Sequence, residues 1–251
     1  MTIFQGIILG LIQGIAEFLP ISSSGHLMLA MHLFETGEAA MMVMIILHIA
    51  TLIAVLYVFR KKIWELMKKP LCKTNLCLAL ATLVTVVFVL LFKDFIDSAI
   101  TVRALPITFI ITAIILYSTT FLESGEKDVD YPRAAAVGLA QGLAVIPGFS
   151  RSGFTISAGL AAGIKREKAA EFSFLMSIPI IIASFVYEIM GGGLSAVSSI
   201  PLFPLIVSFL VALVSGVFAI KFMLHIICKV SLGWFSGYLV VLAVFCLFVV
   251  Y

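Results

Sequence analysis

The sequence predicts an all-α integral membrane protein made of two related halves. Of its 251 residues, 63% are hydrophobic and 12% are charged, whereas a soluble domain carries about 25% charged residues. Continuous apolar runs near the roughly 20 residues of a membrane-spanning helix occur at 39–59, 76–92, 104–122, 170–190, 202–221 and 232–250. The segment GLIQGIAEFLPISSSG at 10–25 returns as GLAQGLAVIPGFSRSG at 138–153, with eight of 16 positions identical at an offset of 128 residues.

The two copies of this repeat interrupt the remaining apolar stretches, 2–34 and 133–163. Each copy holds a helix-breaking proline and several hydroxyls, so each stretch fits a re-entrant hairpin better than a single span. We therefore expect one membrane domain over 1–251, with a re-entrant helix hairpin and three transmembrane helices in each half, 1–125 and 126–251. Because three is an odd number, the second half enters from the opposite face, which makes an inverted-topology repeat.

The distribution of basic residues fixes the expected orientation. The loop 60–75 carries six Lys and Arg against one acid, Glu65, and such loops stay on the cytoplasmic side. Alternation then places 13 of the 16 Lys and Arg on that side and both termini outside. If 2–34 were a full span, the N-terminus would move inside and the inverted symmetry would be lost.

The first repeat motif carries groups suited to acid–base or nucleophilic chemistry. Gln13 and Glu17 are four residues apart and share a helix face. Pro20 ends that helix, and Ser22, Ser23 and Ser24 then lie at the N-terminus of the next one, followed by His26. A carboxylate, hydroxyls and an imidazole in one turn can activate a nucleophile or transfer a proton.

The second motif carries the opposite charge. Arg151 aligns with Ser23 of the first copy, and Ser150, Ser152 and Thr155 surround it. An arginine and hydroxyls at a helix N-terminus suit a phosphate or diphosphate. A buried arginine also needs an anion or a carboxylate as its partner. Facing turns of this kind would form a phosphoryl-transfer or hydrolysis site.

Both motifs resemble those of the undecaprenyl-diphosphate phosphatase family, also called the bacitracin-resistance protein family, and the similarity covers essentially the whole chain. The family signatures are an E/Q-x-x-x-E helix that runs into a Pro/Ser-rich turn with Gly-His, and P-G-x-S-R-S-x-x-T. They stand here as Gln13 and Glu17 with the turn up to His26, and as Pro147 to Thr155.

The resemblance implies hydrolysis of undecaprenyl (C55 polyprenyl) diphosphate to the monophosphate and phosphate, on the outer (periplasmic) side of a bacterial plasma (inner) membrane. This reaction recycles the lipid carrier of peptidoglycan synthesis, supports cell-wall biogenesis and cell shape, and confers bacitracin resistance. It also implies a divalent cation, Mg²⁺ or Ca²⁺. The expected partners are the lipid substrate and the bilayer, with a homodimer left open and nucleic acid excluded.

Residue roles follow from the same resemblance. Glu17 is expected to be essential, as a metal ligand or in acid–base catalysis, with Gln13 as a second metal ligand where many members have Glu. The nucleophile is expected to be Ser23 or His26. Arg151 is expected to bind the diphosphate, supported by the hydroxyls of Ser22, Ser24, Ser150, Ser152 and Thr155.

Two other interpretations compete with this one. Inverted repeats with broken helices are also the plan of secondary transporters, so a transporter or a lipid-carrier flippase is the alternative function. The chemical difference between the motifs, with Glu17 and His26 opposed to Arg151, favours hydrolysis.

Some of the serines are expected to be helix caps only, and His48, inside the first span, is expected to be structural.

Overall fold

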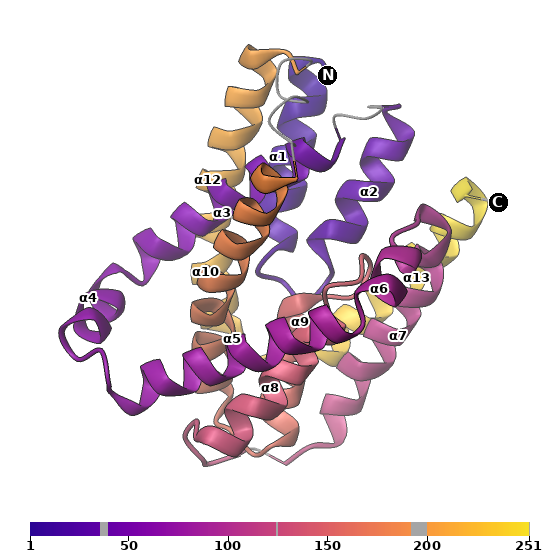
Figure 1. The fold of residues 1–251 in the computed structure, drawn as a ribbon. Coiled ribbons are helices and arrows are strands. Elements are labelled where there is room, and N and C mark those ends of the chain that lie inside the picture. Colours follow the sequence, from indigo (N-terminus) through magenta and orange to yellow (C-terminus); the bar gives the residue numbers. More distant parts are fainter. Residues whose placement is uncertain (36–39, 124, 192–199, 251) are drawn as a thin grey trace.

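The computed structural model describes residues 1–35, 40–123, 125–191 and 200–250, and the regular elements of this part are all helices (Figure 1). In chain order they are α1 (Ile3–Ala16), α2 (Ser23–Leu33), α3 (Ala40–Val58), α4 (Arg60–Lys68), α5 (Lys73–Leu91), α6 (Lys93–Ala99), the 3₁₀ turn η2 (Val102–Ala104), α7 (Leu105–Ser118), η3 (Thr119–Phe121), α8 (Tyr131–Leu143), α9 (Arg151–Ala161), α10 (Arg166–Met190), α12 (Leu202–Ile226) and α13 (Gly233–Val250).

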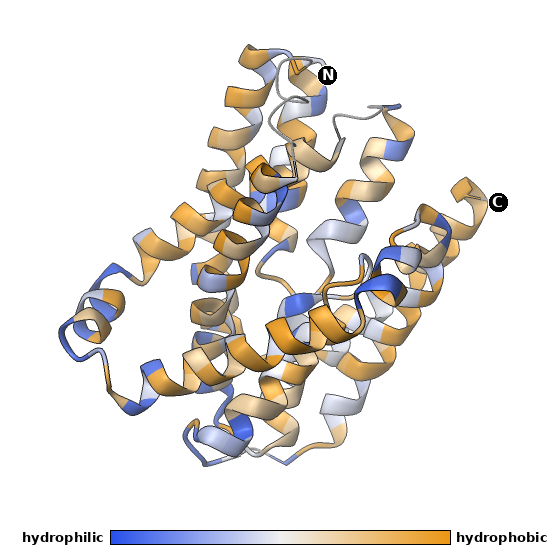
Figure 2. Cartoon of the chain, in the orientation of Figure 1, coloured by the Kyte–Doolittle hydropathy of each residue, from blue (hydrophilic) through white to orange (hydrophobic). Residues whose placement is uncertain are grey.

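Six apolar helices of the described chain are long enough to cross a membrane, and they match the six predicted spans. They are α3, α5, α10, α12 and α13, together with α7 and its flanking 3₁₀ turns over Val102–Phe121. The fourth starts at Arg166 rather than at 170, because the charged residues before the apolar run form its first turn. Figure 2 shows apolar residues along these helices and hydrophilic ones gathered at α4 and at the loops that precede α8 and α10.

Both copies of the repeat form a helix, a non-helical turn and a second helix. In the first copy α1 ends at Ala16 and α2 begins at Ser23. The N-cap of α2 is Ser22, whose hydroxyl accepts a hydrogen bond from the Gly25 N–H at 3.2 Å. In the second copy Ser150 caps α9 in the same way through Gly153, at 3.1 Å. These local bonds satisfy N–H groups that a helix start leaves free.

The first helix of each copy packs against a long helix of the other half. The helix α1 lies beside α12, and α8 lies beside α5 (Figure 1). Glycines make the close approach possible: a Cβ added at Gly10 would lie 2.4 Å from the Ser208 carbonyl oxygen, and one at Gly138 would lie 2.5 Å from that of Ala81. The two halves are therefore joined by reciprocal, backbone-close contacts, as small residues allow between membrane helices.

Gly138→Ala should destabilise the protein by about 1–3 kcal/mol, because the added methyl group pushes α8 away from α5. Gly237→Ala on α13 is the matched control, since an added Cβ meets nothing within 4 Å there, and it should be neutral or slightly stabilising. Thermal unfolding of the detergent-purified variants measures both effects. Equal unfolding temperatures for the two variants would show that the α5–α8 contact does not need this glycine.

Asp130, which lies outside the membrane spans, caps the N-terminus of α8. Its side chain accepts a hydrogen bond from the Arg133 N–H at 3.2 Å and forms an ion pair with the Arg133 guanidinium. Burial alone would raise the pKa of the Asp130 carboxyl, but the N–H and the charge of Arg133 bring that pKa below its ordinary value. A carboxylate that stays charged at the N-terminus of α8 stabilises the helix.

Candidate active site

The two repeat turns meet through a direct ion pair between Glu17 and Arg151. Glu17 follows α1, Arg151 opens α9, and 134 residues separate them in the chain. The Glu17 side chain is only 5% exposed and that of Arg151 is 15% exposed. The carboxylate partner that a buried arginine requires is therefore supplied by the other copy of the repeat. Of the two side chains, that of Arg151 keeps the larger exposed fraction.

The second carboxylate oxygen of Glu17 organises the first motif. Its Oε2 accepts a hydrogen bond from the Ser23 hydroxyl at 2.5 Å and another from the Gln13 side-chain amide at 3.2 Å. Ser23 is buried and is the first residue of α2. A serine hydroxyl that donates to a carboxylate has the geometry of a nucleophile beside its base.

Arg151 is also held from α10. Its second terminal nitrogen, Nη1, donates to the Ser173 carbonyl oxygen at 3.3 Å. The Ser173 hydroxyl lies 2.6 Å from the Thr155 hydroxyl, and Thr155 in turn donates to the Arg151 carbonyl oxygen at 2.8 Å. One terminal nitrogen of the guanidinium is thus held by the Ser173 carbonyl oxygen and the other by Glu17, while the Thr155 and Ser173 hydroxyls link the start of α9 to α10.

The remaining serines take different positions. Ser22 and Ser150 act as helix caps. Ser152 donates to the Leu19 carbonyl oxygen at 3.0 Å, which ties the second turn to the first. Ser24 is half-buried, and within the described residues it shares no hydrogen bond with Glu17, Ser23 or Arg151. The structure therefore brings Ser23 and Ser152 to the junction of the turns, whereas Ser22 and Ser150 stabilise the helices around it.

His26 faces away from the ion pair. Its Nδ1 lies 2.7 Å from the Ser22 carbonyl oxygen, and its Nε2 lies 2.6 Å from the Tyr238 hydroxyl on α13. The imidazole also stacks on the Tyr238 ring, with the centroids 5.6 Å apart. Both ring nitrogens are thus engaged by neighbours other than Glu17 and Arg151. The geometry favours Ser23 over His26 as the group that attacks the substrate.

His48 is a site neighbour that the sequence reading assigned to structure. Its Nε2 lies 3.5 Å from the Glu17 Oε2, and its Nδ1 lies 2.7 Å from the Met44 carbonyl oxygen. The signal available in the sequence was an ionisable group inside an apolar span, which is a functional candidate by default. Ser173 carried no such signal, because a lone serine in a helix is ordinary.

The metal ligands expected from the sequence lie together, but they are few. The described residues hold no group of three or more His, Cys, Asp and Glu that could bind a metal ion. Gln13 is fully buried, and its Oε1 has no hydrogen-bond partner in the described structure, while its Nε2 donates to Glu17 and Thr51. The repeat partner Gln141 has the same unpaired oxygen and donates to Thr85. The unpaired amide oxygen is thus a feature of the repeat that happens to adjoin a carboxylate in one copy.

Fold and site together define a multi-pass helical membrane protein in which two repeated turns join a carboxylate, a hydroxyl and a guanidinium. The chain belongs to the family described as "Bacitracin resistance protein BacA", whose profile matches residues 6–245. It is 42% identical over 250 residues to an undecaprenyl-diphosphatase of Carboxydothermus hydrogenoformans. The matched region covers 97% of this chain and 96% of the relative. An undecaprenyl-diphosphatase of Treponema denticola is 45% identical over 258 residues, covering 96% and 94%.

Proposed function

We propose that this protein hydrolyses undecaprenyl diphosphate to undecaprenyl monophosphate and phosphate, and so recycles the cell-wall lipid carrier and confers bacitracin resistance. The observation that carries the proposal is the contact of Glu17 with both Ser23 and Arg151. The family membership and the names of relatives at 42% and 45% identity support it. No observation on the described residues favours the transporter or flippase alternative.

The chemistry begins with binding of the terminal phosphate by Arg151, whose side chain is 15% exposed. Glu17 accepts the proton of the Ser23 hydroxyl, and Ser23 Oγ attacks the terminal phosphorus. An O–P bond to Ser23 forms, the bridging P–O bond breaks, and undecaprenyl monophosphate leaves. Glu17 gives that proton to the departing monophosphate. Water then attacks the phosphoserine with Glu17 again as the base, and Glu17 returns the proton to Ser23 Oγ as the P–Oγ bond breaks and phosphate leaves. Arg151 offsets the charge on the transferring phosphoryl group.

A divalent cation fits this site only together with the substrate. Glu17 and the unpaired Oε1 of Gln13 are hard oxygen ligands, and Mg²⁺ commonly binds through one or two carboxylates plus substrate phosphates. Glu17 would hold the ion, and Gln13 would join it once its amide turns over, because its Nε2 and not its Oε1 now faces Glu17. The ion would supply charge compensation for the diphosphate.

Gln13→Glu should therefore bind a divalent cation at least about tenfold more tightly than the wild type, because a carboxylate replaces a neutral amide as a ligand. The shift of thermal unfolding with Mg²⁺ or Ca²⁺ concentration measures the affinity without an activity assay. Gln141→Glu, the same change in the other copy of the repeat, is the control and should leave the midpoint concentration unchanged. A midpoint equal to the wild type in Gln13→Glu would remove Gln13 from the metal site.

We further infer an inverted-topology repeat with halves 1–125 and 126–251, in which both helix–turn–helix segments are re-entrant and the site opens to the outer side. The reciprocal packing of α1 on α12 and of α8 on α5 supports the repeat. In a background without the native cysteines, Thr2→Cys should react with an impermeant thiol reagent from outside, and Asp128→Cys only from inside. Both positions are exposed. Labelling of both from one side would contradict the re-entrant arrangement.

A homodimer stays a prediction, which the mass of the protein in detergent checks.

The direct test of the activity is phosphate release from undecaprenyl diphosphate by the purified protein with Mg²⁺ or Ca²⁺ present. Turnover should generate undecaprenyl monophosphate in equal amount to phosphate. A well-folded protein that releases no phosphate under either cation would contradict the proposed function.

A further inference from the structure

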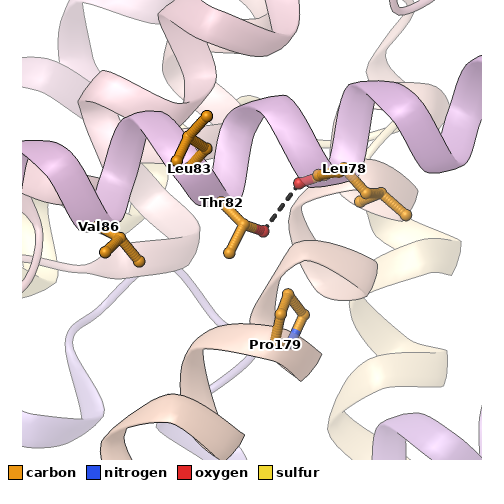
Figure 3. A pocket seen from close by; sticks show the side chains of 6 residues that line it. Leu78, Thr82, Leu83, Val86 and Pro179 are labelled. Atoms are coloured by element: carbon orange, nitrogen blue, oxygen red, sulfur yellow. Dashed lines mark hydrogen bonds between the residues drawn. The ribbon is translucent and has the colours of Figure 1, made fainter.

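An apolar groove lies between α5 and α10 on the side of the molecule shown in Figure 3. It has a volume of about 480 Å³ and is lined by Leu78, Ala79, Thr82, Leu83, Val86 and Pro179. The single hydroxyl on its wall, that of Thr82, donates to the Leu78 carbonyl oxygen at 2.8 Å. The groove therefore offers hydrocarbon and no free polar group, and both of its walls are candidate membrane spans.

The same interface is closed in the other copy of the repeat. There α12 packs against α3, and a Cβ added at Gly216 would lie 3.3 Å from the Ala54 Cβ and 3.5 Å from the Thr51 Cγ2. At the repeat offset of 128 residues, Pro179 takes the place of Thr51 and Phe88 that of Gly216. The Phe88 ring is turned to α8, where a Cβ at Gly142 would meet it at 2.7 Å. At the equivalent position, the described residues of α3 and α12 are in close contact where α5 and α10 leave the groove.

Pro179 is part of this difference. It lies inside α10, where a proline cannot donate the backbone hydrogen bond of its position and its ring disturbs the preceding turn. Figure 3 shows its ring turned toward α5. The proline ring thus stands on the groove wall at the position where Thr51 packs against Gly216 in the other copy.

The two wall helices of the groove make hydrogen bonds to Arg151 or to the helix that precedes its turn. On α10, Ser173 precedes Pro179 by six residues, about 9 Å along the helix axis, and its carbonyl oxygen accepts the hydrogen bond from Arg151. On α5, Thr85 lies next to the groove residues and donates to the Gly138 carbonyl oxygen at 2.8 Å, on the helix that leads into the Arg151 turn. One wall helix of the groove, α10, thus also holds the Arg151 guanidinium, and the other, α5, is bonded to the helix that precedes the Arg151 turn.

We propose that this groove binds the polyprenyl tail of the lipid diphosphate while the diphosphate lies at Arg151. The inference rests on the proposed function and deepens it, because it assigns the tail a path between α5 and α10. A substrate with a long apolar tail and a charged head needs an apolar surface that opens to the bilayer and leads to the charged site. The α5–α10 groove has the composition and the position for this, whereas its counterpart between α3 and α12 is filled.

The test compares a long and a short substrate in a groove-filling variant. Ala79→Trp places a large side chain in the groove, and Leu90→Trp, at an exposed position of α5 outside it, is the matched control. Ala79→Trp should lower kcat/KM for the C55 diphosphate at least about tenfold, the effect of losing roughly two buried methylene groups. Its kcat/KM for a C5 diphosphate, whose single isoprene unit is too short to occupy the groove, should stay within about twofold of the wild type, as should both values for Leu90→Trp.

Equal losses on both substrates, or an unchanged C55 value, would overturn the proposal, and the latter would leave the groove to bilayer acyl chains. A second measurement tests the proposal on the wild type, in case Ala79→Trp folds poorly. A C55 diphosphate with a photoreactive group on its tail should form crosslinks to residues of α5 and α10. Crosslinks confined to α3 and α12 would also overturn it. A wild type that crosslinks in the groove but hydrolyses neither substrate would contradict the proposed function and support the tail site.

Discussion

Ser23→Ala should lower kcat for undecaprenyl diphosphate hydrolysis by about 10³-fold or more, because it removes the nucleophile that Glu17 activates. Ser23 Oγ lies 2.5 Å from the Glu17 carboxylate, and both side chains are buried. The change removes one hydroxyl at a helix start that Ser22 already caps, so the fold should persist. Single-turnover phosphate release measures the effect.

The comparison variant is His26→Ala, whose kcat should fall by less than about tenfold. This loss reflects the missing packing against Tyr238 and not a missing chemical group. The sequence left Ser23 and His26 equal, so this pair of variants separates two mechanisms. A larger loss in His26→Ala than in Ser23→Ala would reverse the assignment and would require the imidazole to leave its contacts with Ser22 and Tyr238.

Arg151→Lys should lower kcat/KM by about 100-fold or more despite keeping the charge, since an ammonium cannot reproduce two directed N–H groups. One terminal nitrogen of Arg151 pairs with Glu17 and the other donates to the Ser173 carbonyl oxygen. A lysine there satisfies at most part of this geometry and presents a point charge to the diphosphate. The loss should appear in KM as well as in kcat, because the arginine binds the ground state too.

Arg133→Lys is the matched control for this prediction. Arg133 also pairs with a carboxylate, Asp130, and donates to a carbonyl oxygen, that of Ala162, but it lies at the start of α8 away from the two turns. Its kcat/KM should stay within about twofold of the wild type, as for an ion pair near the surface. Equal effects of the two substitutions would mean that Arg151 contributes to folding and not to the site.

Much of the fold was predictable because it depends on local composition. The apolar runs predicted all six candidate spans, and their ends differ by only a few residues, as at the charged start of α10. The prolines and hydroxyls at 20–24 and 147–152 predicted the breaks between α1 and α2 and between α8 and α9. The membrane removes most alternatives for the backbone, so local sequence carries more information here than in a soluble protein.

The site was predictable in its residue types but not in its contacts. A buried arginine in one motif demanded an anionic partner, and the other motif contained one acid, so Glu17 with Arg151 could be expected. The position of His48 beside Glu17 could not be expected from the sequence, because it depends on how α3 is rotated against α1. The orientation of His26 depends on Tyr238, 212 residues away, and on the carbonyl oxygen of Ser22 one turn earlier.

The central claim is that the two repeat turns form one hydrolytic site in which Ser23 carries the phosphoryl group. Rapid quench into denaturing detergent near neutral pH, where phosphoserine and phosphohistidine both survive, tests it most directly, with undecaprenyl diphosphate labelled at the terminal phosphate and the wild-type protein. The account predicts label on the protein within the first turnover, mapped by mass spectrometry to Ser23 and absent from Ser23→Ala. Release of labelled phosphate in the first turnover with no label on Ser23, or with label on His26, would contradict it.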